Sequence, residues 1–427
     1  MKRRFFGAAE QTFGSLRIRN FRLFFVGQGV SQVGNWLTLV AQTLLVLELG
    51  GSGIAIGLLT ACQFLPVLLF AAWAGVIADR SDKRKLLMIV QVFAMGQSFA
   101  MAGLAFMGNP PLAAVYAVAM AGGFAMAFDN PARRSFVVEM VPHENVQNAV
   151  SLNSALMTSS RIIGPALAGL LITTVGFPSA FLLDGFSYIA VLVALGMMRT
   201  SELRPSPVAE RAKGQIREGM RYVRRVPELW IPLVMMAIVG TLAFNFTVVF
   251  PLMVTDAFHS NTAMFTVLFS VTSVGSLVGA LYSAHRRTID VRDVAYASLF
   301  FGLAMLAFAV VPSLAWAFPV GLLVGAGSIT FLTTSTAIVQ LKAAPEMRGR
   351  VLALQAIVFL GSTPIGGPIV GFLSDAFGPR VGVLVGGVAG CAAAAWGLWA
   401  YKRVRGSFAA DVPLPEPTDL VVPEPAA

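Results

Sequence analysis

Residues 54–85 read IAIGLLTACQFLPVLLFAAWAGVIADRSDKRK, an unbroken apolar run that ends in a short charged loop. The part from Ile54 to Ala78 contains no acidic or basic side chain. A membrane-spanning helix needs about 20 mostly apolar residues, each adding about 1.5 Å of rise. This stretch therefore predicts a complete transmembrane helix, and the loop that follows it predicts the edge of the membrane.

The composition of the whole chain extends this prediction to the protein. Of its 427 residues, 56% are hydrophobic and 12% are charged, and the mean hydropathy is +0.76. A soluble domain has about 25% charged residues, so a water-soluble fold of this length would expose too much apolar surface. The two cysteines, Cys62 and Cys391, are too few for a disulfide framework or a metal cluster. The first apolar run, Phe21–Leu47, is too long for a signal peptide and predicts a retained helix.

Twelve stretches have the length and hydropathy of a membrane-spanning helix. The chain is therefore predicted to be an all-α membrane protein with twelve transmembrane helices in two pseudo-symmetric six-helix bundles. The predicted spans are Phe21–Leu47, Ile54–Ala78, Leu86–Met107, Leu112–Phe128, Ala149–Thr174, Ser179–Met198, Leu229–Thr255, Ala263–Ala284, Ala295–Val311, Leu314–Val339, Val351–Ser374 and Val381–Tyr401.

Lysine and arginine accumulate on one side of this predicted topology. Of the 31 such residues, all but Arg161 and Arg380 fall in the terminal segments, the central segment or alternate loops. Short loops that are rich in these residues stay in the cytoplasm. We therefore predict a multi-pass protein of the bacterial inner membrane with both termini cytoplasmic. The net charge of +10 reflects this bias and does not indicate nucleic-acid binding.

The two halves of the chain share glycine and proline positions. A shift of 203 positions pairs Gly122 with Gly325, Pro142 with Pro345, Gly164 with Gly367, and Pro165 with Pro368. Such repeats are typical of transporters built from two related bundles. The predicted domains are a basic cytoplasmic N-terminus (1–20), a first bundle (21–198), a cytoplasmic linker with an amphipathic helix on the anionic leaflet (199–228), a second bundle (229–401) and a disordered cytoplasmic tail (402–427).

The loop after the second predicted span combines a small residue, an acid and a run of bases. Gly75 would let a neighbouring helix approach closely. Asp79 ends a helix, where its charge opposes the helix dipole unless an arginine or the N-terminus of another helix receives it. A loop that only orients the protein would explain the bases but neither of these residues. We predict a conformational latch between helices, formed by Gly75, Asp79, Arg80, Lys83, Arg84 and Lys85.

This loop resembles the signature between the second and third helices of the Major Facilitator Superfamily, although Asp82 stands where that signature usually has glycine. The counterpart in the second half is degraded, because Ser283 replaces the acid after Gly279. The stretches 20–25, 63–66, 129–134 and 348–351 are similar to the branch that contains the enterobactin exporter and related secretion effectors. The resemblance covers nearly the whole chain and implies the fold of a secondary transporter.

The fifth predicted span contains Arg161-Ile-Ile-Gly164-Pro165-Ala-Leu-Ala168-Gly169. Gly164, Pro165 and Gly169 resemble the antiporter signature of the superfamily, with Ala168 in place of one glycine, and this resemblance implies export. A proline-kinked packing helix is the alternative. Arg161 lies near the middle of the span, where an arginine normally faces a cavity or a partner. It is predicted either to bind an anionic or polar substrate group or to have a structural role.

Polar residues of the first predicted span indicate a central cavity. Gln28, Gln32 and Asn35 lie near one face of a helix, and in lipid such a face must point inward. Asn245 is the counterpart in the seventh span. Together with Arg161, these residues are predicted to line the substrate cavity.

Energy coupling requires a titratable group or an ion site within the bundles. The coupling ion is predicted to be a proton, and sodium remains the alternative. Asp184, Asp129 and Glu48 are the candidate acids, in addition to Asp79 of the latch. The sequence Gly371-Phe-Leu-Ser-Asp375 repeats the glycine–acid spacing of the latch without its bases, and we interpret it as a helix cap or a coincidence.

Several classes of function are excluded. No lysine follows a glycine, which excludes a Walker-type ATP loop, and the three histidines are scattered. We therefore predict no enzyme, no cofactor and no metal site. The predicted function is an ion-gradient-driven exporter of a small amphipathic molecule, drug-like or siderophore-like, that works as a monomer by alternating access. An importer or facilitator of a small metabolite is the alternative, followed by a non-transporting membrane sensor.

Overall fold

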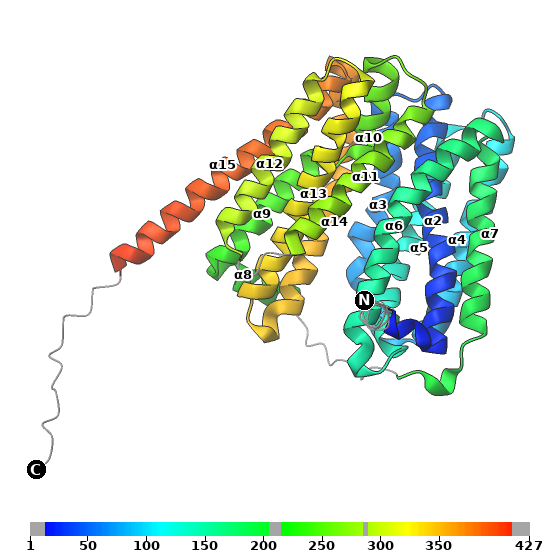
Figure 1. Ribbon diagram of the computed structural model, residues 1–427, viewed down its shortest axis with the longest axis horizontal. Coiled ribbons are helices and arrows are strands. Elements are labelled where there is room, and N and C mark those ends of the chain that lie inside the picture. The colour runs from blue at the N-terminus through cyan, green and yellow to red at the C-terminus, as the bar shows by residue number, and fades with distance from the viewer. Residues whose placement is uncertain (1–12, 205–214, 285–288, 412–427) are drawn as a thin grey trace, which may run out of the picture.

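The computed structural model describes residues 13–204, 215–284 and 289–411, and every regular element in these ranges is helical. Two bundles stand side by side, one from each half of the chain (Figure 1). The first bundle consists of α2 (Arg19–Glu48), α3 (Gly53–Arg80), α4 (Lys83–Phe106), α5 (Leu112–Glu139), α6 (Val146–Thr174) and α7 (Phe177–Gly196). Short 3-10 turns, η1 (Gly14–Arg17), η2 (His143–Asn145) and η3 (Thr200–Glu202), flank these helices.

The second bundle begins after a short connecting helix, α8 (Gln215–Arg225), which lies where the amphipathic linker helix is predicted. Its helices are α9 (Pro227–Leu242), α10 (Phe246–Leu252) with the π turn η4 (Met253–Ala257), α11 (Ala263–Ala284), α12 (Val291–Val310), α13 (Leu314–Lys342), α14 (Pro345–Phe377) and α15 (Pro379–Asp411).

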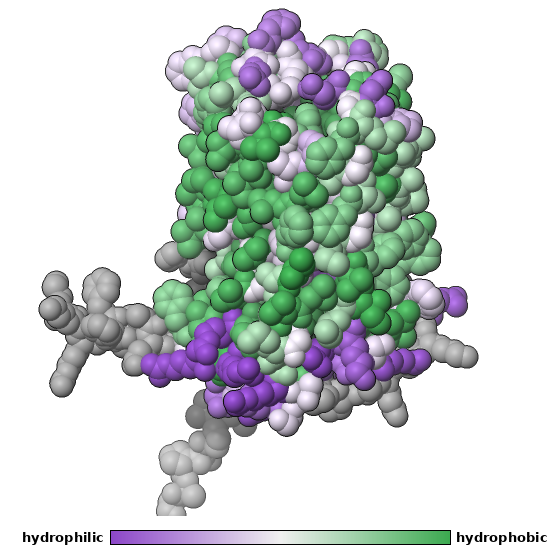
Figure 2. Space-filling model, turned by 90° about the vertical axis from the view of Figure 1, so that its right-hand side faces the viewer, coloured by the Kyte–Doolittle hydropathy of each residue, from purple (hydrophilic) through white to green (hydrophobic). Residues whose placement is uncertain are grey.

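Among the described residues, twelve helical segments are long and apolar enough to cross a membrane. The predicted number of spans is therefore confirmed. Figure 2 shows a broad apolar belt between two more hydrophilic ends. Large apolar side chains such as Leu69 and Ile89 are more than half exposed on the surface of the molecule. Lipid tails, unlike water, make such exposure favourable, and the helices satisfy the backbone groups that lipid cannot hydrogen-bond.

The two bundles meet mainly through two helix pairs, α3 with α14 and α6 with α11, and α10 adds smaller contacts with α3 and α2. The bundles converge at one end and splay apart at the end where α8 lies (Figure 1). We call the first the far end, which carries Gly53 and Asp375, and the second the basic end, which carries Arg80 and α8. Arg380, the cation predicted on the far side, donates to the carbonyl oxygens of Ala309 and Val311 at 2.9 and 2.8 Å. It thus caps the C-terminus of α12, which explains an arginine at this end.

The predicted end of the fourth span at Phe128 is wrong, because α5 continues to Glu139. The sequence changes there from apolar to charged residues, which we interpreted as a loop. In the structure Arg133 Nη2 lies 3.0 Å from Asp129 Oδ2, one helical turn away. This pairing within the helix neutralises both charges, so the helix can continue beyond the apolar stretch.

The predicted seventh span is not one continuous helix. It divides into α9, α10 and η4, with Asn245 at the break between Leu242 and Phe246. The Nδ2 atom of Asn245 donates to the carbonyl oxygen of Thr241 at 2.7 Å. That carbonyl would accept the backbone N–H of residue 245 in a continuous helix, so the side chain takes the place of a backbone hydrogen bond.

The predicted tail, 402–427, is partly helical, because α15 extends to Asp411. Lys402 and Arg403 lie within this helix, and both are exposed. The rest of the predicted tail, most of the N-terminal segment and part of the linker lie outside the described residues (1–12, 205–214 and 412–427).

Candidate transport pathway and coupling site

A cavity of about 1600 Å³ lies between the two bundles at the basic end. We call it the inter-bundle cavity. Its walls come from the lower halves of α3 and α14, the pair of helices that splays apart in Figure 1, and α8 adds a further wall. Most of the wall is apolar, including Val67, Leu68 and Ala72 on α3, and Leu354 and Ile357 on α14.

The mouth of this cavity is basic. The arginines that line it, here called the arginine rim, are Arg80, Arg217, Arg221, Arg224, Arg225 and Arg350. One acid, Glu346, also lines the cavity. Glu218 of α8 pairs with Arg350 of α14 through a distance of 2.8 Å between Oε2 and Nη1. The rim therefore has a strong excess of positive charge.

The far end is closed by a contact between the bundles. Asp375, near the end of α14, accepts hydrogen bonds from the backbone N–H groups of Gly53 (2.6 Å) and Ile54 (2.9 Å) at the start of α3. Asp375 is thus a helix cap, which was one of our two interpretations of the stretch 371–375. The helix that it caps belongs to the opposite bundle. A carboxylate is well suited to this position, because the first N–H groups of a helix lack partners and carry partial positive charge.

Glycines allow the two helices to approach closely beside this contact. A Cβ atom on Gly57 of α3 would lie 2.5 Å from the carbonyl oxygen of Gly367 on α14. A Cβ atom on Gly53 would lie 2.7 Å from the carbonyl oxygen of Gly371. Larger side chains at these positions would force α3 and α14 apart.

The residues of the predicted latch lie at the basic end. Gly75 and Arg80 line the inter-bundle cavity. Lys83 pairs with Glu139 of α5 (2.6 Å), and both side chains are buried. Arg84 donates to the carbonyl oxygens of Leu195 and Gly196 at the end of α7, at 2.7 and 3.3 Å.

Asp82, which lies among the latch residues, fixes the turn before α4. Asp82 is the N-cap of α4 and accepts a hydrogen bond from the backbone N–H of Lys85 at 3.1 Å. The turn is therefore held firmly to the first bundle. The role of Asp79 in a conformational latch between helices stays a prediction.

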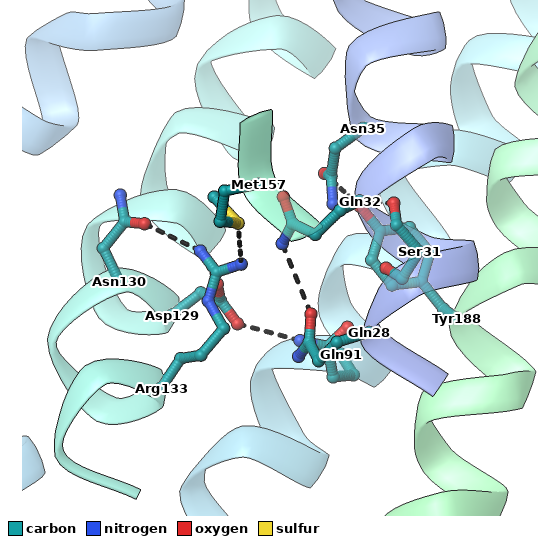
Figure 3. Close-up of polar contacts among 10 residues, drawn as sticks. All are labelled: Gln28, Ser31, Gln32, Asn35, Gln91, Asp129, Asn130, Arg133, Met157 and Tyr188. Carbon is teal, nitrogen blue, oxygen red and sulfur yellow. Dashed lines mark hydrogen bonds and ion pairs between the residues drawn. The ribbon is translucent and has the colours of Figure 1, made fainter. Parts of the chain in front are cut away.

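A second, smaller pocket of about 230 Å³ lies inside the first bundle. We call it the polar pocket. Gln32 and Asn35, both predicted to line the substrate cavity, lie along it (Figure 3). Asn35 Oδ1 accepts a hydrogen bond from the Tyr188 hydroxyl at 2.9 Å, and Gln32 Nε2 donates to Gln28 at 3.3 Å. Gln28 itself is buried beside the pocket but does not line it.

Asp129 reaches this pocket from α5 as part of a hydrogen-bonded group (Figure 3). Its Oδ1 atom accepts from Gln91 Nε2 at 2.8 Å, and its Oδ2 atom pairs with Arg133 at 3.0 Å. Arg133 also donates to Asn130 Oδ1 at 2.9 Å and contacts the sulfur of Met157 at 3.5 Å. The carboxylate of Asp129 is therefore compensated by a buried guanidinium.

Asp184 lines the same pocket and is 1% exposed. Its Oδ2 atom accepts hydrogen bonds from the hydroxyls of Thr38 (2.8 Å) and Ser98 (2.6 Å). Its Oδ1 atom has no partner, nor do Gln91 Oε1 and Gln97 Nε2, which belong to other residues of the pocket lining. Buried polar atoms without partners are rare and indicate space for a water, an ion or another polar ligand. No cation lies within hydrogen-bonding distance of this carboxyl among the described residues.

The other predicted site residues lie apart from both spaces. Glu48 is exposed at the end of α2, at the far end, and its role in coupling stays a prediction. Arg161 of α6 stacks over the Trp36 ring at 5.5 Å from the guanidinium carbon, and its Nε atom is buried without a partner. Asn245 is 2% exposed, and its Oδ1 atom also has no partner.

The antiporter-like residues of α6 lie at helix contacts. Gly164 faces Trp36 of α2, and Gly169 faces Thr266 of α11 in the opposite bundle so closely that a Cβ atom would overlap its hydroxyl. Pro165 is buried within α6. This geometry matches the packing interpretation of the motif, and its effect on transport direction stays a prediction.

Gln91, Gln97 and Tyr188 are pocket residues that our reading of the sequence missed, and it placed Arg133 in a loop. The spacing of Asp129 and Arg133, one helical turn apart, is the signal that could have shown that the helix continues. No such signal marks the glutamines, because isolated polar residues in spans also occur at helix contacts. Among the residues that the structure describes, no three His, Cys, Asp or Glu side chains gather where they could hold a metal.

Comparison with known proteins places this geometry in a family. The profile of the family described as transmembrane secretion effector matches residues 10–418. The staphyloferrin A transporter of Staphylococcus aureus is 24% identical over 362 residues, which cover 84% of this chain and 90% of that protein. Macrolide efflux protein A of Streptococcus pyogenes is 24% identical over 369 residues, covering 85% and 90%. The multidrug efflux pump Tap of Mycolicibacterium fortuitum is 26% identical over 357 residues, covering 81% and 87%.

The fold is also found in solved structures. A bacterial homolog of the human lysosomal transporter Spinster, in an inward-facing and occupied conformation, superposes with a TM-score of 0.74 at 15% identity over 94% of this chain and 99% of that one. A POT family transporter in complex with 5-aminolevulinic acid gives a TM-score of 0.74 at 11% identity, over 90% and 96%. With twelve apolar helices in two bundles, the chain belongs to the transmembrane secretion effector family of the Major Facilitator Superfamily and is a multi-pass membrane transporter, not an enzyme.

Proposed function

We propose that this protein is an ion-gradient-driven exporter of a small amphipathic organic molecule that works by alternating access. The observation that carries the proposal is the asymmetry of the two ends. A cavity of about 1600 Å³ separates the bundles at the basic end, whereas Asp375 and close glycine contacts hold them together at the far end. This asymmetry supports a transporter that is open at one end and closed at the other, which is one of the two conformations of alternating access.

The orientation follows from the charge distribution. Short loops rich in lysine and arginine stay in the cytoplasm, so the basic end faces the cytoplasm and both termini lie there. In a bacterial inner membrane, the inter-bundle cavity then opens inward. This is the state in which an exporter takes up its substrate.

Two matching devices would control the exchange of states. Asp375 and Gly371 on α14 hold the start of α3 at the far end in the present state. Asp79 and Gly75 on α3 have the same four-residue spacing at the other end of the same helix pair. In the outward-open state Asp79 would meet the start of α14 as Asp375 meets the start of α3. Formation of the Asp79 contact at the basic end would then require the Asp375 contact at the far end to break.

The polar pocket is the proposed coupling site, with a proton as the coupling ion. Intramembrane acids commonly mark proton pathways. Asp129 already pairs with Arg133, whereas Asp184 is held only by hydroxyl groups and has one oxygen without a partner. We therefore assign proton exchange to Asp184 and a positioning role to Asp129.

Export and an amphipathic organic substrate are supported by the relatives, which include a staphyloferrin A transporter, a macrolide efflux protein and a multidrug efflux pump. The cavity, with its large apolar walls and charged mouth, has the composition expected for such a ligand. The protein is proposed to function as a monomer within the lipid bilayer.

The test measures uptake into everted membrane vesicles of a lipophilic cationic dye and of a catecholate siderophore, with and without an imposed proton gradient. Vesicles without the protein and vesicles treated with an uncoupler are the controls. Accumulation that needs both the protein and the gradient supports a coupled exporter. Movement of a substrate only down its own concentration gradient would instead support the alternative of a facilitator or importer.

A further inference from the structure

The inter-bundle cavity combines two kinds of surface that together specify a ligand. Its walls on α3 and α14 are mostly apolar, and their side chains include Val67, Ala71, Ile357 and Leu360. Its mouth is the arginine rim. A ligand that fills both parts needs an apolar body and a charged head of negative sign.

The arginine rim is available for such a head. Arg350 pairs with Glu218, but Arg80, Arg221 and Arg225 have no acidic partner among the described residues. These three side chains are also exposed at the mouth of the cavity. A guanidinium without a carboxylate partner can form two parallel hydrogen bonds with a carboxylate, sulfonate or phosphate.

Orientation in the membrane alone does not explain this arrangement. The positive-inside rule requires cations at this end but not around a cavity. Several other cations of the same end are engaged by acids or carbonyl groups: Lys83 pairs with Glu139, Arg84 caps α7, and Arg133 pairs with Asp129. Arg80, Arg221 and Arg225 differ from these because they line the cavity and have no acidic partner among the described residues.

We propose that the inter-bundle cavity binds an amphipathic anion, with its acidic head on the arginine rim and its apolar body between α3 and α14. This inference rests on the proposed exporter function and narrows its substrate class to anions. Apolar burial supplies most of the affinity, whereas the rim selects the sign of the charge and guides the ligand to the mouth.

The test compares two fluorescent probes with the same apolar body, pyrenebutyrate and pyrenebutylamine. Binding of each probe to the purified full chain is measured by fluorescence anisotropy in nanodiscs of phosphatidylcholine. Wild type is compared with Arg221→Gln/Arg225→Gln, which removes two charges of the rim. The matched control is Arg292→Gln/Lys402→Gln, which removes two exposed charges that do not line the cavity.

Wild type is expected to bind pyrenebutyrate at least tenfold more tightly than pyrenebutylamine. Loss of two partly exposed charge contacts should weaken pyrenebutyrate binding on the order of tenfold. A rise in salt should weaken it in wild type more than in the rim variant, because exposed charges are screened. The control variant should bind like wild type. Size-exclusion profiles and melting temperatures of the variants check that all are folded.

Equal affinity for the two probes, or unchanged pyrenebutyrate binding in the rim variant, would overturn the proposal. A third arm adds phosphatidylglycerol to the nanodiscs. If this lipid displaces pyrenebutyrate from wild type but not from the rim variant, the rim is a lipid headgroup site and the assignment to substrate is wrong.

Transport assays separate this inference from the exporter function. If pyrenebutyrate binds but no tested substrate accumulates in everted vesicles under a proton gradient, the proposed anion site stands and coupled export is refuted. If the cationic dye accumulates under the gradient but pyrenebutyrate does not bind, the proposed exporter function stands and the anion site is refuted.

Discussion

Asp375 offers the most direct test of alternating access, because it is a single carboxylate that joins the two bundles. Replacement by alanine (Asp375→Ala) removes both acceptors and leaves the N–H groups of Gly53 and Ile54 to water. The side chain is exposed, so its removal creates no internal cavity. The change should therefore destabilise the closed far end without destabilising either bundle.

The size of the effect follows from two contributions. Loss of an acidic N-cap costs about 1 kcal/mol. Loss of a negative charge at a helix N-terminus costs about 0.3–1 kcal/mol when the site is exposed. Together these give about 1–2 kcal/mol, which changes the ratio of inward-open to outward-open molecules by about 5- to 30-fold toward outward-open.

Double electron–electron resonance between spin labels measures this ratio. Ala72 and Ala356 line the inter-bundle cavity from opposite bundles, and both are exposed there. Labels on cysteines at these positions should show a long distance in the inward-open state and a short one when the basic end closes. The background carries Cys62→Ala and Cys391→Ala. The long-distance population should fall in the Asp375→Ala protein.

Asp256→Ala is the matched control, because this acid is also exposed at the far end but, within the described ranges, its side chain bonds only to its neighbour Thr255. Its distance distribution should match that of the background. If Asp375→Ala leaves the ratio within twofold of the background, the carboxylate does not hold the far end closed. The proposed exchange of two helix-capping acids would then be refuted.

The remaining predictions concern the coupling site, the basic-end latch and the glycine contact. Asp184→Asn should abolish gradient-driven accumulation in everted vesicles but retain downhill movement of substrate, because an amide cannot release a proton; retained accumulation would exclude Asp184 as the coupling acid. Asp79→Asn should depress transport with unchanged expression, and full transport would rule out an essential latch acid. Gly57→Val should shift the spin-label distances toward outward-open, because its Cβ would clash with α14, whereas Gly96→Ala, with no atom within 4 Å of the added Cβ, should not.

The sequence by itself determined the membrane class, the number of spans and the family. These properties depend on runs of neighbouring residues, since lipid requires about 20 apolar residues for each crossing. The same local reasoning misjudged α5, because a charged run looks like a loop until Asp129 and Arg133 are seen to pair within the helix. It also missed the break at Asn245, where a side chain replaces a backbone hydrogen bond.

The tertiary structure decided which residues act together. It placed Asp375 of α14 on the start of α3, more than 300 residues earlier in the chain, and brought Asp184 of α7 to hydroxyls of α2 and α4. It also turned α8 and its arginines toward the cavity between the bundles. The pattern of a single helix shows which side chains share a face. The packing of whole helices, set by the shapes of residues far apart in the chain, determines what that face meets.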